Sequence, residues 1–289
     1  MTPSPAELRA RAEEASAGLP ALMLSAERLA ASVTAGVHGK RRAGMGEDFW
    51  QYRPATSGDS ARSIDWRRSA RSDGQFVRDR EAEMAQSAVI WVSAAAGMDF
   101  AGGPDRPTKR DRADLLALAL GMALLNGGER VAIAGHLPRA GRMQAERMAD
   151  DLVRRLSISG DDDTPAPELL RSGQRLILID DFLGDPAPML AYLDRAAGSG
   201  IRGAMLQILD PDEEAFPYGG AVLFRSAGGA LSHDTRDAGG LRDAYLARLA
   251  ERREVLGRAA LNAGWNFGTH DTASAPAQAL LWLWSVLEG

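Results

Sequence analysis

The sequence predicts an α/β fold, with a doubly wound and mostly parallel β-sheet covered by helices on both faces. The first observation is that short, almost continuous apolar runs alternate with helical segments from residue 88 onward. Strands of this kind are typical of parallel sheets that are buried on both sides. The second is that a chain of 289 residues, 45% of them hydrophobic, can bury a core of that size.

The elements follow one another in a regular order. We expect strands at residues 88–92, 130–134, 175–179 and 203–209, and a short fifth strand at 221–224 that forms an edge of the sheet. We expect helices at residues 115–125, 143–156, 188–196, 241–260 and 276–287. In such folds, functional sites form where the strands end at their carboxyl side.

The chain divides into three predicted parts: residues 1–35, 36–85 and 86–289. The first is a helical arm, because Ser4, Pro5 and Glu7 resemble a capped helix start and a loose apolar face follows at residues 22–33. The second is an Arg-rich insertion of poor periodicity. From Lys40 to Arg80 it has ten basic and six acidic residues, a net charge of +4. The third is the α/β domain.

Composition excludes several classes of protein. The net charge of -5 argues against a protein that coats nucleic acid. The absence of cysteine excludes disulfide scaffolds and thiolate zinc sites. The first residues lack the basic and apolar regions of a secretory signal, and no apolar run approaches the ~20 residues of a membrane-spanning helix. We therefore expect a cytoplasmic protein that is not integral to the membrane.

Common nucleotide and nucleophile motifs are absent or out of context. Gly198 to Gly203 matches the dinucleotide pattern G-x-G-x-x-G, but a helix precedes it and a strand follows, which is the reverse of the order that binds pyrophosphate. The sequence has no P-loop and no G-x-S-x-G nucleophile elbow. The four histidines are far apart and form no helical metal pair.

Two aspartates end the third strand, where an α/β protein could hold a cation or an acid–base pair. They are Asp180 and Asp181. Mg²⁺ would need further oxygen ligands, whereas the segment after the first strand, Ser93 to Gly97, offers one hydroxyl and no carboxylate. A turn or helix-capping role is the favoured interpretation, and a metal-dependent hydrolase is an alternative function.

Acidic and basic residues interleave around Trp66 in the Arg-rich insertion. Arg side chains can pair with carboxylates in two parallel hydrogen bonds, so Asp59 with Arg62 and Asp65 with Arg71 would pin the insertion to the sheet. The same residues could instead form a surface for a partner. A further alternative is phosphate or nucleic-acid binding through the arginines of this region, which are Arg62, Arg67, Arg68, Arg71, Arg78 and Arg80.

This region resembles the bacterial family called domain of unknown function 58. The residues that carry the resemblance are Phe49 to Arg53, Gly58, Asp59, Arg62, Asp65, Trp66, Arg71 and Arg78. Asp180 to Leu183, and Leu209 to Glu214 with Phe216 and Pro217, resemble later segments of the family. The likeness extends from Gly36 to the C-terminus.

The resemblance implies a von Willebrand factor A-like (Rossmann-type) fold and a role as partner of a MoxR-type AAA+ ATPase or of other von Willebrand-type proteins. The family usually carries an Asp-x-Ser-x-Ser-like metal motif after the first strand. Here Ser93, Ala95 and Gly97 stand in its three oxygen-donor positions, and Asp181 matches the rim of the metal site. We therefore expect a degenerate metal site, no metal, no cofactor and no catalytic residues, in a non-enzymatic interaction protein.

Overall fold

The computed structural model describes residues 22–32, 49–54, 69, 76–80, 87–155, 160, 163–169, 171, 173–229 and 232–288. The chain forms two units, one of Met1–Gly36 with Gln86–Gly289 and the other of Val37–Ala85. In the smaller unit, β1 (Phe49–Pro54) pairs antiparallel with β2 (Phe76–Arg80).

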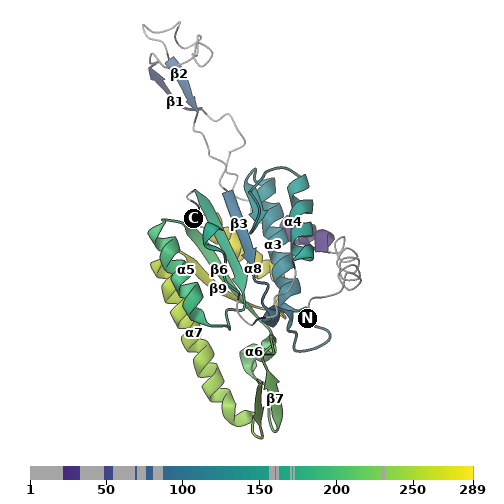
Figure 1. Ribbon diagram of the computed structural model, residues 1–289. Coiled ribbons are helices and arrows are strands. Elements are labelled where there is room, and N and C mark those ends of the chain that lie inside the picture. Colours follow the sequence, from purple (N-terminus) through teal and green to yellow (C-terminus); the bar gives the residue numbers. More distant parts are fainter. Residues whose placement is uncertain are drawn as a thin grey trace. The chain divides into compact units, whose positions relative to one another are not determined.

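The larger unit is built on a five-stranded parallel sheet in the order β4-β3-β5-β6-β9 (Figure 1). The strands are β3 (Ser87–Val92), β4 (Arg130–Ile133), β5 (Gln174–Asp180), β6 (Arg202–Leu209) and β9 (Asn266–Asp271). The other elements of this unit are η1 (Ala96–Asp99), α3 (Lys109–Asn126), α4 (Met143–Arg154), η2 (Pro167–Leu169), α5 (Pro186–Gly198), α6 (Pro211–Ala215), β7 (Val222–Arg225), β8 (Ser232–Thr235), η3 (Gly239–Leu241), α7 (Arg242–Asn262) and α8 (Pro276–Glu288).

Side chains alternate between the two faces of the sheet, as the period of a strand requires. On β3, Ile90 and Val92 enter one core with α3, α4 and α8, while Val89 and Trp91 enter another with α5 and α7. Helices thus cover both faces of a parallel sheet, which confirms the predicted fold class.

A helix at residues 22–32 belongs to the first of these cores. Ala26, Leu29 and Ala30 are buried there together with side chains of α3 and α8. The earlier predicted helix start, with Ser4, Pro5 and Glu7, lies outside the described residues. None of the helices that can be described is long and apolar enough to cross a membrane.

The helix expected at residues 115–125 is longer than predicted, since α3 begins at Lys109. Thr108 caps it by accepting a hydrogen bond from the Asp111 amide, and the Asp111 side chain accepts one from the Thr108 amide in return. This reciprocal cap is the physical reason for the earlier start. It also brings Lys109 to the carboxyl edge of the sheet.

The strand expected at residues 221–224 forms, but its predicted place at an edge of the main sheet is wrong. It is β7, and it pairs antiparallel with β8 in a separate two-stranded sheet. The two edges of the main sheet are formed by β4 and β9. The sequence of β9, Asn-Phe-Gly-Thr-His-Asp, has no apolar run, and only one of its residues is buried.

Candidate functional site

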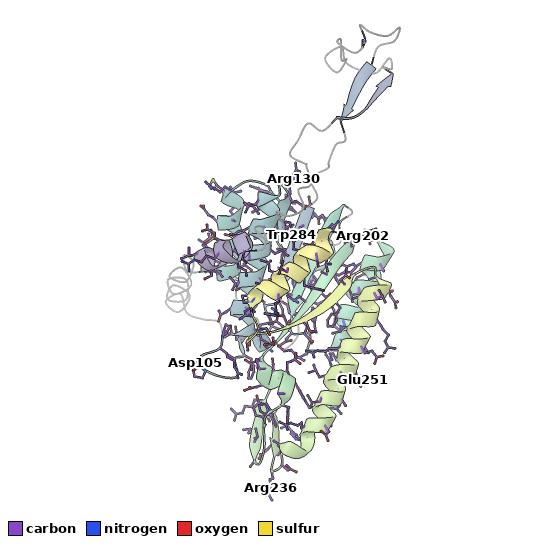
Figure 2. All side chains as sticks on the ribbon, turned by 180° about the vertical axis from the view of Figure 1, so that it is seen from behind. Asp105, Arg130, Arg202, Arg236, Glu251 and Trp284 are labelled. Carbon is purple, nitrogen blue, oxygen red and sulfur yellow. The ribbon has the colours of Figure 1, made fainter. Side chains whose placement is uncertain are left out.

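The carboxyl ends of the parallel strands gather the buried polar residues of this fold. Figure 2 shows Arg130 and Arg202, at the starts of β4 and β6, at one end of the unit, with Asp105 and Arg236 toward the other. At that second end lie the buried polar residues that follow β3, β5, β6 and β9: Ser93, Asp181, Asp210 and Thr272, with Asp180 as the last residue of β5.

The centre of this edge is the side chain of Lys109. Its Nζ donates to Oδ2 of Asp181 at 2.7 Å and to Oε1 of Glu213 at 2.6 Å. The Lys109 side chain is only 1% exposed, and its ammonium lies 5.6 Å from the centre of the Phe100 ring. An ammonium is costly to bury without partners, so these two carboxylates hold it in place.

The charges of the cluster depend on one another. Burial alone would lower the pKa of Lys109, but attraction to Asp181 and Glu213 outweighs it and the pKa is raised. Burial raises the pKa of Glu213, against the opposing effect of Lys109. Burial, and then the neighbouring charge of Asp181, raises the pKa of Asp180 well above 3.8, so this carboxyl favours its neutral form.

The loop after β3 closes the cluster from one side. A Cβ atom on Gly97 would lie 2.8 Å from Oδ2 of Asp181, the same oxygen that accepts from Lys109. The Ser93 side chain is buried, and its Oγ accepts from the Ala95 amide at 3.2 Å. The structure therefore places Gly97 against Asp181, while Ser93 and the buried Ala95 lie in the same loop at this edge.

The turn after Asp181 adopts an uncommon backbone conformation. Phe182 has a φ of 49°, in the left-handed region that residues with a Cβ rarely occupy. Burial of its ring near Phe267, with ring centres 6.5 Å apart, compensates for this conformation. The turn lets Oδ1 of Asp181 accept from the Leu183 amide at 3.0 Å while Oδ2 accepts from Lys109.

A second set of acids lies beside the first at the start of α6. Asp210 is fully buried and accepts hydrogen bonds from the Gly102 amide at 3.0 Å and from Thr272 Oγ1 at 3.2 Å, and Arg106 Nη2 lies 3.2 Å from it. The Glu213 carboxylate accepts from the Asp210 amide at 2.8 Å through Oε2 and from Lys109 through Oε1. Glu213 thus joins the cap of α6 to the ammonium.

The metal that the family resemblance implies does not fit this cluster. The carboxylate oxygens of Asp181 and Glu213 already accept from the ammonium and from backbone amides, and Gly97 leaves no room for an oxygen-bearing side chain. Among the residues that the structure describes, no group of three or more His, Cys, Asp or Glu side chains is placed to hold a metal ion. One carboxyl oxygen of Asp180 has no hydrogen-bond partner there.

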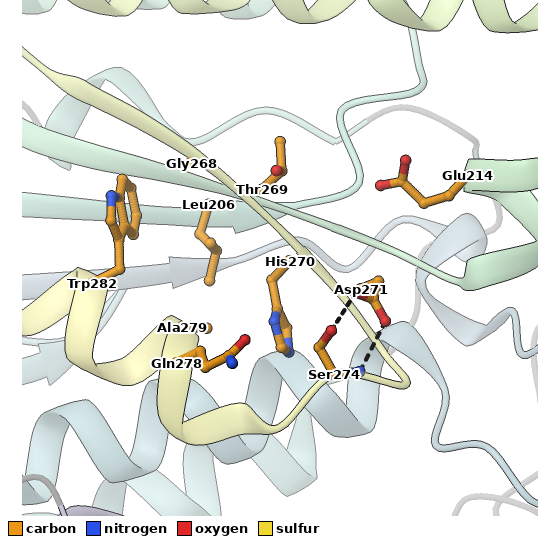
Figure 3. A pocket seen from close by; sticks show the side chains of 10 residues that line it. All are labelled: Leu206, Glu214, Gly268, Thr269, His270, Asp271, Ser274, Gln278, Ala279 and Trp282. Carbon is orange, nitrogen blue, oxygen red and sulfur yellow. Dashed lines mark hydrogen bonds between the residues drawn. The ribbon is translucent and has the colours of Figure 1, made fainter.

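A cavity of about 380 Å³ lies near this edge, between β9 and α8 (Figure 3). His270 and Trp282 line it, and Asp271 in its wall accepts from the amide and hydroxyl of Ser274. The ring of His270 meets Arg112 Nη1 at 2.7 Å through Nε2. Burial and then Arg112 lower the pKa of His270 to about 4, so the ring is neutral near neutral pH.

Sequence reasoning missed Lys109 and Arg106, and it placed Asp210 and Glu213 in a family-like segment without giving them a role at this site. The Thr108–Asp111 capping pattern would have placed Lys109 at the start of a helix, and the Asp210–Glu213 spacing is a second capping box. Of the predicted signature residues, Arg78 lies on β2 opposite Tyr52. The others, which are Gly58, Asp59, Arg62, Asp65, Trp66 and Arg71, lie outside the described residues, as do Arg67 and Arg68.

Comparison with known proteins identifies the family. A family model described as protein of unknown function DUF58 matches residues 51–255. The chain belongs to this family. The DUF58 match covers nearly all of the segment that carries the resemblance and most of the α/β unit.

Relatives of this DUF58 chain occur in mycobacteria. The uncharacterized proteins Mb1516 of Mycobacterium bovis and Rv1480 of Mycobacterium tuberculosis are each 26% identical to it over 257 residues, which cover 84% of this chain and 80% of the relative.

Two solved structures are similar in part. An aerotolerance-related membrane protein from Bacteroides fragilis is 13% identical, with a TM-score of 0.44 over 70% of this chain and 98% of that one. BatB from Bacteroides thetaiotaomicron is 14% identical, with a TM-score of 0.41 over 71% and 100%.

Proposed function

We propose that this chain is a non-enzymatic protein–protein interaction protein of the cytoplasm, an adaptor for a MoxR-type AAA+ ATPase in the assembly or maturation of protein complexes. The observation that carries the proposal is the closure of the carboxyl-edge cluster by Lys109. Its ammonium is 1% exposed and is held by two carboxylates.

A catalytic site needs a reactive group that a substrate can approach. In this cluster, Asp181 and Glu213 hydrogen-bond the ammonium, and the side chains of Asp180 and Ser93 are buried. A metal-dependent hydrolase would use these same carboxylates as ligands, and they are not free for that role. The edge that commonly carries chemistry in α/β folds is therefore better suited to hold a surface in a fixed shape.

The choice of partner follows from family membership and from charge. The resemblance to DUF58 proteins implies an ATPase of the MoxR type, with other von Willebrand-type proteins as further partners. The net charge of -5 disfavours nucleic acid as the main partner. The Arg-rich segment, with Trp and Arg residues of the kind that anchor interfaces, is the proposed contact region.

The test is capture of partners from the native cytosol with the tagged full chain, with and without ATP, followed by mass spectrometry. We expect a AAA+ ATPase to be recovered, and its recovery to fall with Arg71→Ala. Arg258→Ala is the matched control, because this arginine is 66% exposed on α7 and forms a long pair with Glu254 at 3.4 Å. Recovery of nucleic acid, or of no ATPase, would overturn the proposal.

A further inference from the structure

We propose that the Lys109 ammonium is a built-in replacement for the divalent cation of this fold. It supplies positive charge at the carboxyl edge from within the chain, so that the edge keeps its shape without metal. The inference deepens the proposed function at one point, the degenerate metal position. Its test measures metal binding and stability, whereas the proposed function stands or fails on capture of the ATPase.

The Lys109 ammonium lies at the position that the resemblance assigns to the metal site. The resemblance places Gly97 in the third oxygen-donor position and Asp181 at the rim, and in the structure a Cβ on Gly97 would lie 2.8 Å from Asp181 Oδ2. The ammonium of Lys109 lies 2.7 Å from that same oxygen. The cation of Lys109 therefore touches the carboxylate at the point where the two halves of the metal motif meet.

The carboxyl groups at this edge need a positive charge beside them. Three carboxyl groups, those of Asp180, Asp181 and Glu213, lie at this edge, and burial raises the pKa of Asp180 and of Glu213. Buried carboxylates need a cation or protons to offset their mutual repulsion. The Lys109 ammonium supplies this cation and donates hydrogen bonds of 2.7 and 2.6 Å to Asp181 and Glu213.

Lys109 is buried at a place in a helix where a lysine is ordinarily exposed. It is the first residue of α3, where the helix dipole disfavours a positive side chain. A lysine at such a place would ordinarily extend into solvent, yet this one is 1% exposed. The carboxylates of Asp181 and Glu213, and not the helix, decide where the ammonium lies.

The loop after β3 offers few oxygen atoms to a metal. Of its residues Ser93, Ala95 and Gly97, only Ser93 has a side-chain oxygen, and that oxygen accepts from the Ala95 amide. The loop carbonyls of Ser93, Ala94 and Ala95 accept hydrogen bonds from the guanidinium of Arg110.

A pair of variants separates a cation position from an ordinary buried ion pair. Lys109→Ala removes the ammonium and leaves room, whereas Lys109→Met removes the charge and fills most of the volume. Thermal unfolding of each variant and of the wild type is measured in EDTA, in Mg²⁺ and in Mn²⁺. Arg110→Ala is a further control, because it removes a cation from the same edge without opening the cluster.

We expect the wild-type melting temperature to be the same in all three media. Both Lys109 variants are expected to melt lower in EDTA, and Mn²⁺ or Mg²⁺ to raise the melting temperature of Lys109→Ala in a saturable manner, but not that of Lys109→Met or Arg110→Ala. Absence of any metal-dependent shift for folded Lys109→Ala would reduce Lys109 to a structural ion pair and overturn the proposal.

A measurement on the wild type keeps the proposal testable if Lys109→Ala does not fold. Titration of the full chain with Mn²⁺, followed by calorimetry, is expected to show no site that depends on Asp181. Binding of one Mn²⁺ that is lost in Asp181→Asn would show that metal displaces the ammonium, and the proposal would be wrong.

Discussion

Lys109 Nζ lies 2.7 Å from Asp181 Oδ2, although the two residues are 72 positions apart in the sequence. The contact joins the start of α3 to the end of β5. It makes the carboxyl edge of the sheet a closed cluster in which the ammonium offsets the charge of buried carboxylates. Four predictions on stability follow from this edge and its surroundings.

Removal of the ammonium should destabilise the fold strongly. Lys109→Met leaves Asp181 and Glu213 buried without their cation, and loss of one member of a buried ion pair costs about 3–5 kcal/mol. Glu213→Gln in the same chain should recover part of this loss, because it removes one of the uncompensated charges. Urea unfolding of the single and double variants measures the coupling, and additive effects would contradict it.

A side chain at position 97 should push Asp181 away from Lys109. Gly97→Ser places a Cβ 2.8 Å from Asp181 Oδ2, and overpacking of this kind costs about 1–3 kcal/mol. Gly198→Ser is the matched control, since a Cβ on Gly198 meets no atom within 4 Å. Equal melting temperatures for the two variants would show that the loop after β3 accommodates the added side chain without loss of stability.

Acid should weaken the fold through His270. The pKa of His270 is lowered from 6.5 to about 4 in the folded protein, so the unfolded chain binds more protons between these values. Stability is therefore lost as the pH falls from 6.5 toward 4, by up to about 3 kcal/mol. His270→Gln keeps an acceptor for Arg112 and should flatten this part of the stability curve.

The exposed His136 provides the control for that experiment. Its side chain is 58% exposed and pairs with Asp151 across 3.3 Å. His136→Gln should leave the acid limb of the stability curve as in the wild type. A curve that flattens equally in both variants would refute the assignment of the effect to His270.

Asp180 should change the stability with pH in the direction opposite to that of His270. Its pKa is raised well above 3.8 by burial and by Asp181, so the folded state holds a proton that the unfolded chain has lost. Stability from this group is complete below pH 3.8 and is lost as the pH rises toward the folded pKa. Asp180→Asn should remove that loss and be no less stable than the wild type at pH 8 by chemical denaturation. A less stable variant at that pH would contradict the prediction.

Apolar and partly polar strands differ in how far their sequence predicts them. Leu176, Ile177, Leu178 and Ile179 of β5 are buried on both faces, so their apolar run indicates a strand without further information. The edge strand β9 contains Asn266, which is exposed, and the partly polar run that follows. Its pairing with β6, and not its composition, makes it a strand.

Some residues of the candidate site could likewise be predicted from the sequence, and others could not. The positions of Ser93, Gly97 and Asp181 after strands β3 and β5 could be predicted, because parallel strands end at one edge and such edges hold sites. Lys109 could not, because a lysine at a helix start is ordinarily solvated. Its role depends on carboxylates 72 and 104 positions away.

The sequence by itself determined the α/β class and the family, since periodicity and residue identity are local properties. Only the tertiary structure decided that the Lys109 ammonium lies between the carboxylates of Asp181 and Glu213. The reason is physical: an ammonium becomes buried when folding brings enough negative charge to it. In this chain that charge comes from Asp181, which directly follows β5, and from Glu213 in α6.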